Sequence, residues 1–427
     1  MNINSILNFS HLSKYFVPSN NDMPDRRFDL DWLRVGVFGL LILFHTGMFY
    51  VESWPWHVKS EHLSQFLENI MLLVEPWRMG VLWVISGIAI RFVMVKVSVW
   101  RFISMRTLRL LLPLLFGVLI IIPPQLYIEM TFNGDLNMNF WQFLQAFFSS
   151  DSTVFDKYQY GIWQHFNANH LWFIAALWKY SLFLLCLLPL LNTKLVNSVT
   201  DWLFKQYGLL AIFIAVLPIF FIQMNWELDS VRYPLGFTLM VYGYLIGWNK
   251  IFWQRIKENL RPLLVIALIF YCLLIALYNL VWLDMLKNES LQEGWIYSVI
   301  MFNYSMLRLI GVLTVFSFAH NFLNKKSHKL TYFNDAVYPF YILHQTLIVV
   351  IGFNLSKLDL GPVYEPMLLI SLTTLGCFIG YEFIRRTEIL RPFFGLKMSN
   401  NYSSSINKLG YISASLVMLP LAWQIIA

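Results

Sequence analysis

Long apolar runs separated by short polar segments dominate the chain. A run of about 20 apolar residues is long enough to cross a bilayer as a helix. Eleven runs approach or reach this length, at about residues 30–50, 76–95, 108–128, 170–191, 207–223, 233–248, 262–283, 296–319, 336–353, 364–384 and 409–426. The pattern predicts an all-α, polytopic integral membrane protein with about 10–11 transmembrane helices.

The composition agrees with this fold class. Hydrophobic residues make up 58% of the 427 residues and charged residues only 13%, and the mean hydropathy is +0.58. We expect a cytoplasmic N-terminal segment at residues 1–28, a transmembrane domain at 29–395, and a linker with a last transmembrane helix at 396–427. The first segment is polar and mixed, which argues against a cleavable signal peptide.

The distribution of the 31 Lys and Arg residues predicts the orientation. With the N-terminus in the cytoplasm, most of them fall in inner segments, as the positive-inside rule requires. The C-terminus then lies outside. Because the basic residues follow the predicted loops, the net charge of +7 indicates membrane orientation and not nucleic-acid binding. Only six fall in outer segments, namely Lys59, Arg78, Lys157, Arg232, Lys287 and Lys357.

The first apolar run begins with charged residues and contains a histidine. Ten residues separate Arg34 from His45, so both side chains share nearly one helix face, about 16 Å apart along the axis. A histidine at that depth is costly without a partner. Two interpretations stay open. Asp31, Arg34 and His45 serve helix electrostatics and interhelical hydrogen bonding, or Arg34 meets an anionic ligand while His45 acts as a general base.

Two further segments offer chemistry with a structural alternative. Arg106 and Arg109 share one face at the start of the third span, where they either bind phosphates or anchor the helix to lipid headgroups. Ser86 and Gly87 either leave room for a ligand chain or permit close helix packing, and packing is the better-supported interpretation.

The remaining candidates are aromatic and histidine residues. His344, in the ninth span near Tyr338 and Tyr341, has the hydrogen-bonding neighbours to line a polar cavity. The outer segment at residues 129–170 is rich in aromatic and amide side chains, which suits carbohydrate binding as well as an ordinary folded loop. We expect no metal site, because the histidines and the three cysteines (Cys186, Cys272 and Cys377) lack ligand spacing.

Taken together, these segments resemble the membrane acyltransferase-3 family. That family carries an Asp-x-x-Arg-x10-His pattern in its first span, which Asp31, Arg34 and His45 match with the spacing intact. A segment ending in Ser-Gly follows in its second span, matched by Ser86 and Gly87.

The match at the third span is incomplete. Arg106, Arg109 and Pro113 fit the family's arginine motif, but Met105 stands where one of two adjacent arginines belongs. The segments His170-Leu-Trp172-Phe and Tyr338-Pro-Phe-Tyr341-Ile-Leu-His344 point to a subgroup that includes periplasmic-glucan succinyltransferases. The chain ends shortly after the last run, so we expect no C-terminal esterase-like domain.

The resemblance implies an O-acyltransferase of the bacterial cytoplasmic (inner) membrane. Acyl-coenzyme A would be a co-substrate rather than a permanently bound cofactor, and acetyl or succinyl would pass to a hydroxyl of an extracytoplasmic glycan or glycolipid. Asp31, Arg34 and His45 would carry the chemistry, and Arg34, Arg106, Arg109, Ser86 and Gly87 would bind the donor. The acceptor would meet Glu129, His170, Trp172, Tyr338, Tyr341 and His344.

Two other functions stay open from the residues. A polytopic exporter of polysaccharide or a lipid-linked precursor would also have many spans and polar groups within the membrane, but it predicts an internal symmetry that the sequence lacks. A transferase with a lipid-phosphate sugar donor would use acidic residues near the outer surface, for which Glu52, Glu75 and Glu129 are candidates. The acyl group, the acceptor and the oligomeric state do not follow from the sequence.

Overall fold

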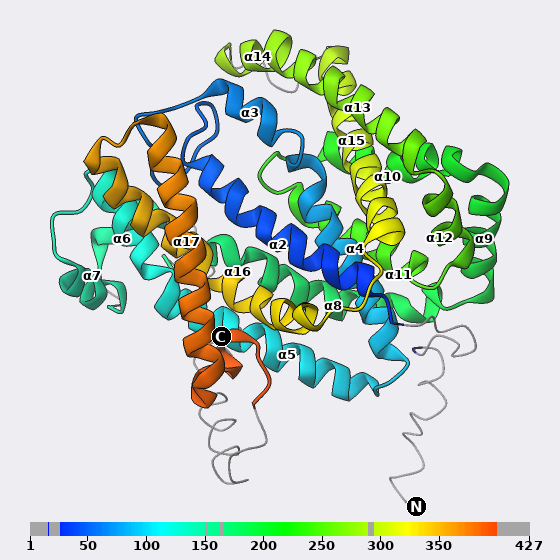
Figure 1. The fold of residues 1–427 in the computed structure, drawn as a ribbon, viewed down its shortest axis with the longest axis horizontal. Helices are drawn as coiled ribbons and strands as arrows, with labels where there is room; N and C mark the ends of the chain where they lie inside the picture. The colour runs from blue at the N-terminus through cyan, green and yellow to red at the C-terminus, as the bar shows by residue number, and fades with distance from the viewer. Residues whose placement is uncertain are drawn as a thin grey trace, which may run out of the picture. The chain divides into compact units, whose positions relative to one another are not determined.

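The computed structural model describes residues 26–149, 152–159, 165–288 and 294–398, together with Phe16 and Gly161. Over these residues it is built of helices and contains no β-strand (Figure 1). This confirms the predicted all-α fold class. Most of the predicted N-terminal segment (1–28) and of the linker with a last helix (396–427) lies outside the described residues, and the domain boundaries stay predictions.

Ten of the eleven predicted spans coincide with helices. Seven segments of the described chain are long and apolar enough to cross a membrane, namely Gln65–Met94, Val99–Phe132, Asn169–Leu191, Leu260–Lys287, Gly294–Phe322, His328–Leu358 and Gly361–Arg386. Three further predicted runs form the shorter or more polar helices α2 (Phe28–Met48), α10 (Ala211–Asn225) and α11 (Arg232–Ile246). The eleventh run, at 409–426, lies outside the described residues. The protein is therefore a multi-pass membrane protein.

The described chain divides into two compact units. The first contains the residues before Phe38 together with Glu68–Ile103 and Tyr180–Leu330, and the second contains Phe38–Leu67, Ser104–Lys179 and the residues after Leu330. Each unit is thus assembled from three separate stretches of sequence. Helix α2 contributes its first part to the first unit and its second part, with His45, to the second.

In the first unit, helices α4 (Glu75–Met94) and α15 (Gly294–Phe322) organise the packing. Helix α4 packs against α11, and Gly87 makes this possible, because a Cβ atom there would lie 1.9 Å from the Met240 carbonyl oxygen. Small residues at such crossings let two backbones approach closely. Helix α15 packs against α13 (Leu260–Leu277), α4 and α10. Shorter helices complete this unit, namely α9 (Lys194–Tyr207), α12 (Lys250–Glu258), α14 (Leu283–Lys287) and most of α3 (Gln65–Met71).

In the second unit, a bend in one long segment positions a histidine. Helix α5 (Val99–Phe116) passes through the π-helical turn η2 (Gly117–Ile121) into α6 (Pro123–Phe132). The 3₁₀ turn η4 (Asn169–Leu171) packs on this bend, and the Leu171 side chain lies against Gly117. His170 lies in η4, just before α8 (Trp172–Leu191), so this contact places it beside the bend. Short π-helical turns often occur at functional sites.

An apolar cluster joins the turn after α2 to helix α16 (His328–Leu355). Phe49 and Val58, from the residues that follow α2, are fully buried together with Ile348 and Val349 of α16. This packing brings the end of α2, and with it His45, beside the middle of α16. Helix α17 (Gly361–Arg386) follows and contributes Leu369 to the same cluster.

The segment between α6 and η4 forms a small aromatic core of its own. Helix α7 (Phe140–Phe147) packs on α6 (Figure 1), and Phe143, Phe147 and Phe155 are buried. His165 stacks on Phe155, with ring centroids 4.1 Å apart, and its Nε2 lies 2.8 Å from the Phe147 carbonyl oxygen. Burial lowers the pKa of His165, and the hydrogen bond to Phe147 offsets this only in part. Much of the predicted aromatic surface is therefore the core of a folded loop.

Candidate active site

His45 and His344 lie in direct contact in the second unit. Nδ1 of His45 is 2.7 Å from Nε2 of His344. The two ring planes differ by only 17°, and the ring centroids are 4.9 Å apart, about two ring radii more than the two nitrogens. The hydrogen bond therefore lies close to both ring planes. The two histidines are 299 positions apart in the sequence, and α2 and α16 bring them together.

The neighbours of His344 assign the protons in this pair. Its Nδ1 lies 2.8 Å from the Tyr341 carbonyl oxygen and 3.2 Å from that of Phe340. A carbonyl oxygen only accepts, so Nδ1 of His344 carries hydrogen, and in the neutral ring Nε2 is an acceptor. Nδ1 of His45 then donates to it. This leaves Nε2 of His45 as the basic nitrogen, which is the form that a general base requires.

Two more predicted residues support the pair. The His170 ring lies edge-on to His344, with centroids 5.4 Å apart, and its Nε2 is 3.0 Å from the Ile342 carbonyl oxygen. Tyr341 donates a hydrogen bond to the carbonyl oxygen of His170. His170, Tyr341 and His344 are all buried. Residues predicted from separate segments therefore share one site with His45.

A histidine–carboxylate pair, His57 with Glu129, adjoins the His45–His344 pair. Nδ1 of His57 lies 2.6 Å from Oε2 of Glu129, and Nε2 of His57 lies 3.1 Å from Nε2 of Gln345, the residue after His344. Trp56 connects the two pairs, because its ring stacks on His45 with centroids 5.4 Å apart and also contacts His57.

Sequence reasoning selected Glu129 but missed the residues around it. His57 was one of several histidines in predicted outer segments, Gln125 was not selected, and Gln345 was considered only as a hydrogen-bonding neighbour of His344. The available signals were local: Gln345 follows His344, and Gln125 lies one helical turn before Glu129 on α6. In the structure Gln125 is 0% exposed and Gln345 is 2% exposed, and they share a hydrogen bond of 3.2 Å. Two buried amides beside histidines are typical of a polar site.

Comparison with known proteins decides the family. The family model described as an acyltransferase domain, acyltransferase 3, matches residues 27–382. The chain belongs to the acyltransferase-3 family. Glucans biosynthesis protein C of Escherichia coli strain K12 is 25% identical over 350 residues, which cover 78% of this chain and 85% of that protein. The proteins of that name from strains SMS-3-5 / SECEC and O1:K1 / APEC match over the same length and at the same identity. No solved structure matches the chain significantly.

Membership in the acyltransferase-3 family makes this protein a membrane acyltransferase, and the family pattern lies on helix α2. Asp31 and Arg34 belong to the first unit and His45 to the second, along one unbroken helix. Asp31 Oδ2 accepts a hydrogen bond of 3.1 Å from Arg26, while Arg34 lies 3.9 Å from the other carboxylate oxygen. Asp31 therefore lies beside Arg34 at the i, i+3 spacing, and it also binds Arg26.

The other residues of the second unit that were predicted to bind the acyl donor or the acceptor substrate lie on α5, on α16 and at the start of α8. The Tyr338 hydroxyl donates to the Arg109 carbonyl oxygen at 3.3 Å, which ties α16 to α5 beside the predicted arginine motif. Arg106 lies one turn before Arg109 on α5. Trp172 begins α8, and its ring contacts Phe173. Their predicted ligand contacts stay predictions.

Ser86 and Gly87 serve helix packing in the first unit. The Ser86 hydroxyl donates to the Leu82 carbonyl oxygen of its own helix at 2.7 Å, and Gly87 lies against the backbone of α11. This is the packing interpretation of the pair. Its predicted contact with a donor chain is untested.

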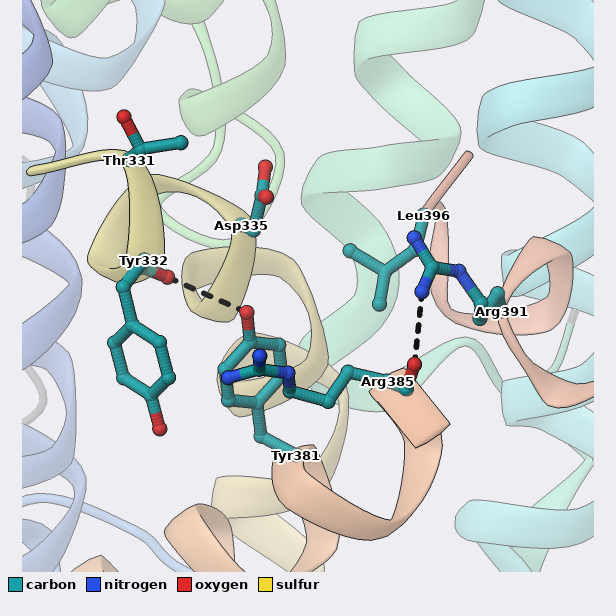
Figure 2. Close-up of a pocket in the computed structure, with 7 residues that line it drawn as sticks. All are labelled: Thr331, Tyr332, Asp335, Tyr381, Arg385, Arg391 and Leu396. Atoms are coloured by element: carbon teal, nitrogen blue, oxygen red, sulfur yellow. Dashed lines mark hydrogen bonds between the residues drawn. The ribbon is translucent and has the colours of Figure 1, made fainter. Parts of the chain in front are cut away.

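A pocket of about 310 Å³ lies at the ends of α16 and α17 in the second unit (Figure 2). Its lining includes two arginines, but both are paired. Arg385 lies 3.0 Å from Glu382. Arg391 donates to the Arg385 carbonyl oxygen at 2.8 Å (Figure 2). Because these charges are already engaged, the histidine pairs are the stronger candidate for the reaction centre.

Proposed function

We propose that this acyltransferase moves an acyl group, acetyl or succinyl, from cytoplasmic acyl-coenzyme A to a hydroxyl of an extracytoplasmic glycan or glycolipid. The single observation that carries the proposal is the hydrogen bond between His45 and His344. It holds His45 in the tautomer whose Nε2 accepts a proton. The printed name of the Escherichia coli relatives, which refers to the biosynthesis of glucans, supports a glucan-type acceptor.

In the proposed reaction, the acceptor oxygen attacks the carbonyl carbon of the thioester while His45 Nε2 takes the hydroxyl proton. The new carbon–oxygen bond replaces the carbon–sulfur bond, and coenzyme A leaves as a thiolate that recovers the proton from His45. His344 stabilises the transient positive charge on His45, because its Nε2 accepts the Nδ1 hydrogen. A dry site favours this chemistry, since hydrolysis of the thioester would waste the donor.

An acyl-histidine intermediate on His45 is the alternative route. We favour direct transfer, since one attack needs no intermediate when both substrates meet at His45. In either route α2 links the donor to the reaction centre. Arg34 lies on the same helix as His45, and a guanidinium suits the phosphates of coenzyme A.

Binding of acetyl-coenzyme A and succinyl-coenzyme A to the purified protein tests the donor. We expect saturable binding of at least one of them, about tenfold weaker in Arg34→Ala because a charge-assisted contact is lost, and unchanged in His45→Ala. Arg255→Ala, which removes an exposed arginine of α12, is the matched control. Absence of binding by the wild type would contradict the assignment of acyl-coenzyme A as the donor.

A further inference from the structure

The His57–Glu129 pair has the features of a binding site for a hydroxyl group. His57 lies in the segment after α2 and Glu129 on α6, both in the second unit. Their hydrogen bond of 2.6 Å is short, as expected for a charge-assisted contact. Because the carboxylate accepts the hydrogen of His57 Nδ1, the lone pair of the neutral ring is on Nε2. Their side chains are 18% and 19% exposed, so a ligand can reach them.

The Gln345 amide, which lies next to this lone pair, has fewer N–H hydrogens than there are hydrogen-bond acceptors around it. Nε2 of Gln345 lies 2.8 Å from Asn169 Oδ1, 3.1 Å from His57 Nε2 and 3.2 Å from Gln125 Oε1. An amide nitrogen carries two hydrogens, so three acceptors compete for two. Rotating the amide by 180° would turn its oxygen toward these acceptors, which is worse.

The rest of the network does not relieve this shortage. The Gln125 amide nitrogen donates to Thr346 Oγ1 at 2.6 Å and lies 3.4 Å from His170 Nδ1, and the Thr346 hydroxyl donates to the Ile121 carbonyl oxygen. The hydrogens of the Gln125 amide nitrogen are therefore directed away from His57. Since Gln125 and Gln345 are buried and His57 is partly exposed, His57 Nε2 is the acceptor that an incoming donor can satisfy.

We propose that His57 Nε2 accepts a hydrogen bond from a hydroxyl of the acceptor substrate, and that Glu129 holds His57 in the required tautomer. This deepens the proposed function by assigning an acceptor subsite, and it rests on that function only for the reaction that follows binding. The subsite adjoins the reaction centre, because Gln345 follows His344 and Trp56 stacks on His45.

The chemistry of the subsite selects the class of ligand. A hydroxyl donates to the histidine, whereas an anionic group would be repelled by the Glu129 carboxylate. A neutral saccharide carries several hydroxyls, so one binds His57 while a neighbouring one is presented to His45. His57 is a positioning residue in this assignment, and His45 keeps the proton transfer.

Donor-free binding of a glucose oligosaccharide tests the subsite directly, by calorimetry on the purified full-length protein. We expect the wild type to bind, and His57→Phe to bind about tenfold more weakly, since one hydrogen bond is lost. Glu129→Leu should weaken binding similarly, whereas Glu129→Gln should retain most of it, because its amide oxygen still accepts from His57 Nδ1. In transfer assays His57→Phe should raise KM for the saccharide more than it lowers kcat.

A neighbouring histidine provides a matched control. His62 lies in the same segment as His57 and also faces a carboxylate, with Nε2 3.9 Å from Asp359 Oδ1, but it is outside the network. His62→Phe should bind the oligosaccharide like the wild type, and all variants should bind acyl-coenzyme A alike. The subsite is refuted if the wild type does not bind saccharide, or if His57→Phe binds as tightly as the wild type. Failure of the donor assignment would appear separately, as absence of acyl-coenzyme A binding.

Discussion

The chemical character of His45 depends on a neighbour that is distant in the sequence. An imidazole with either nitrogen protonated is equally neutral, but only one tautomer presents a basic Nε2. His344 selects that tautomer because its own Nδ1 is held by two carbonyl oxygens of α16. A hydrogen bond at one ring nitrogen commonly determines which tautomer a histidine adopts in a protein.

Substitution of His344 tests this orientation. His344→Phe removes the acceptor for His45 Nδ1, so we expect kcat for acyl transfer to fall about 10²-fold while the affinity for acyl-coenzyme A stays unchanged. His344→Gln should lose less, because an amide oxygen can still accept that hydrogen. Steady-state kinetics and donor binding measure the two effects. Equal activity of wild type and His344→Phe would show that His45 does not depend on this contact.

At the scale of elements, the close pairing of α4 with α11 depends on two glycines, Gly87 of α4 and Gly243 of α11. A methyl group at position 87 would meet the backbone of Met240, which cannot move as a flexible side chain would. We therefore expect Gly87→Ala to lower the free energy of unfolding by about 1–3 kcal/mol. The loss would be measured as a lower melting temperature in detergent.

A second helical glycine gives the control for that substitution. A Cβ atom at Gly36 of α2 would meet nothing within 4 Å. Alanine is the better helix former by about 1 kcal/mol, so Gly36→Ala should leave the melting temperature unchanged or raise it. A Gly87→Ala protein as stable as the wild type would contradict the close α4–α11 contact.

The aromatic loop that contains α7 should respond to pH. Burial lowers the pKa of His165, so the unfolded loop binds a proton more readily than the folded loop. The stabilisation from neutral His165 is present above the usual histidine pKa of about 6.5 and is lost as the pH falls through the lower, folded-state pKa.

Hydrogen exchange measures this effect. The amides of α7 should exchange faster at pH 5 than at pH 7.5, after correction for the intrinsic exchange rate. His165→Phe keeps the stacking on Phe155 and removes the titration, so its corrected protection should be similar at both pH values. Equal protection of the wild-type loop at both pH values would refute the assignment.

At the scale of the whole molecule, apolar runs predicted the helices because burial in lipid demands long apolar segments. Even the short, aromatic run at 233–248 forms a helix, α11. The pairing of helices was not predictable in the same way, since it depends on local shape. The sequence marked Gly87 as a packing residue, but it did not indicate that α11 is the partner, nor did it mark Gly243, which faces the Val84 backbone in the same contact.

The same limit applies to the site. The spacing of Arg34 and His45 on one helix was readable, whereas the contact of His45 with His344 depends on how α2 and α16 pack. His57 was overlooked because a loop histidine has no periodic signal, and only its approach to Glu129 and Gln345 marks it. The cytoplasmic position of the N-terminus remains a prediction from the basic residues.

Acyl transfer across a sealed membrane tests the central claim most directly. Purified protein is reconstituted into liposomes, with labelled acetyl- or succinyl-coenzyme A on one side and a glucose oligosaccharide on the other. We predict that wild-type protein labels the oligosaccharide, and that His45→Ala binds the donor normally but transfers at least about 10²-fold more slowly, because the general base is missing. Undiminished transfer by His45→Ala would contradict the account.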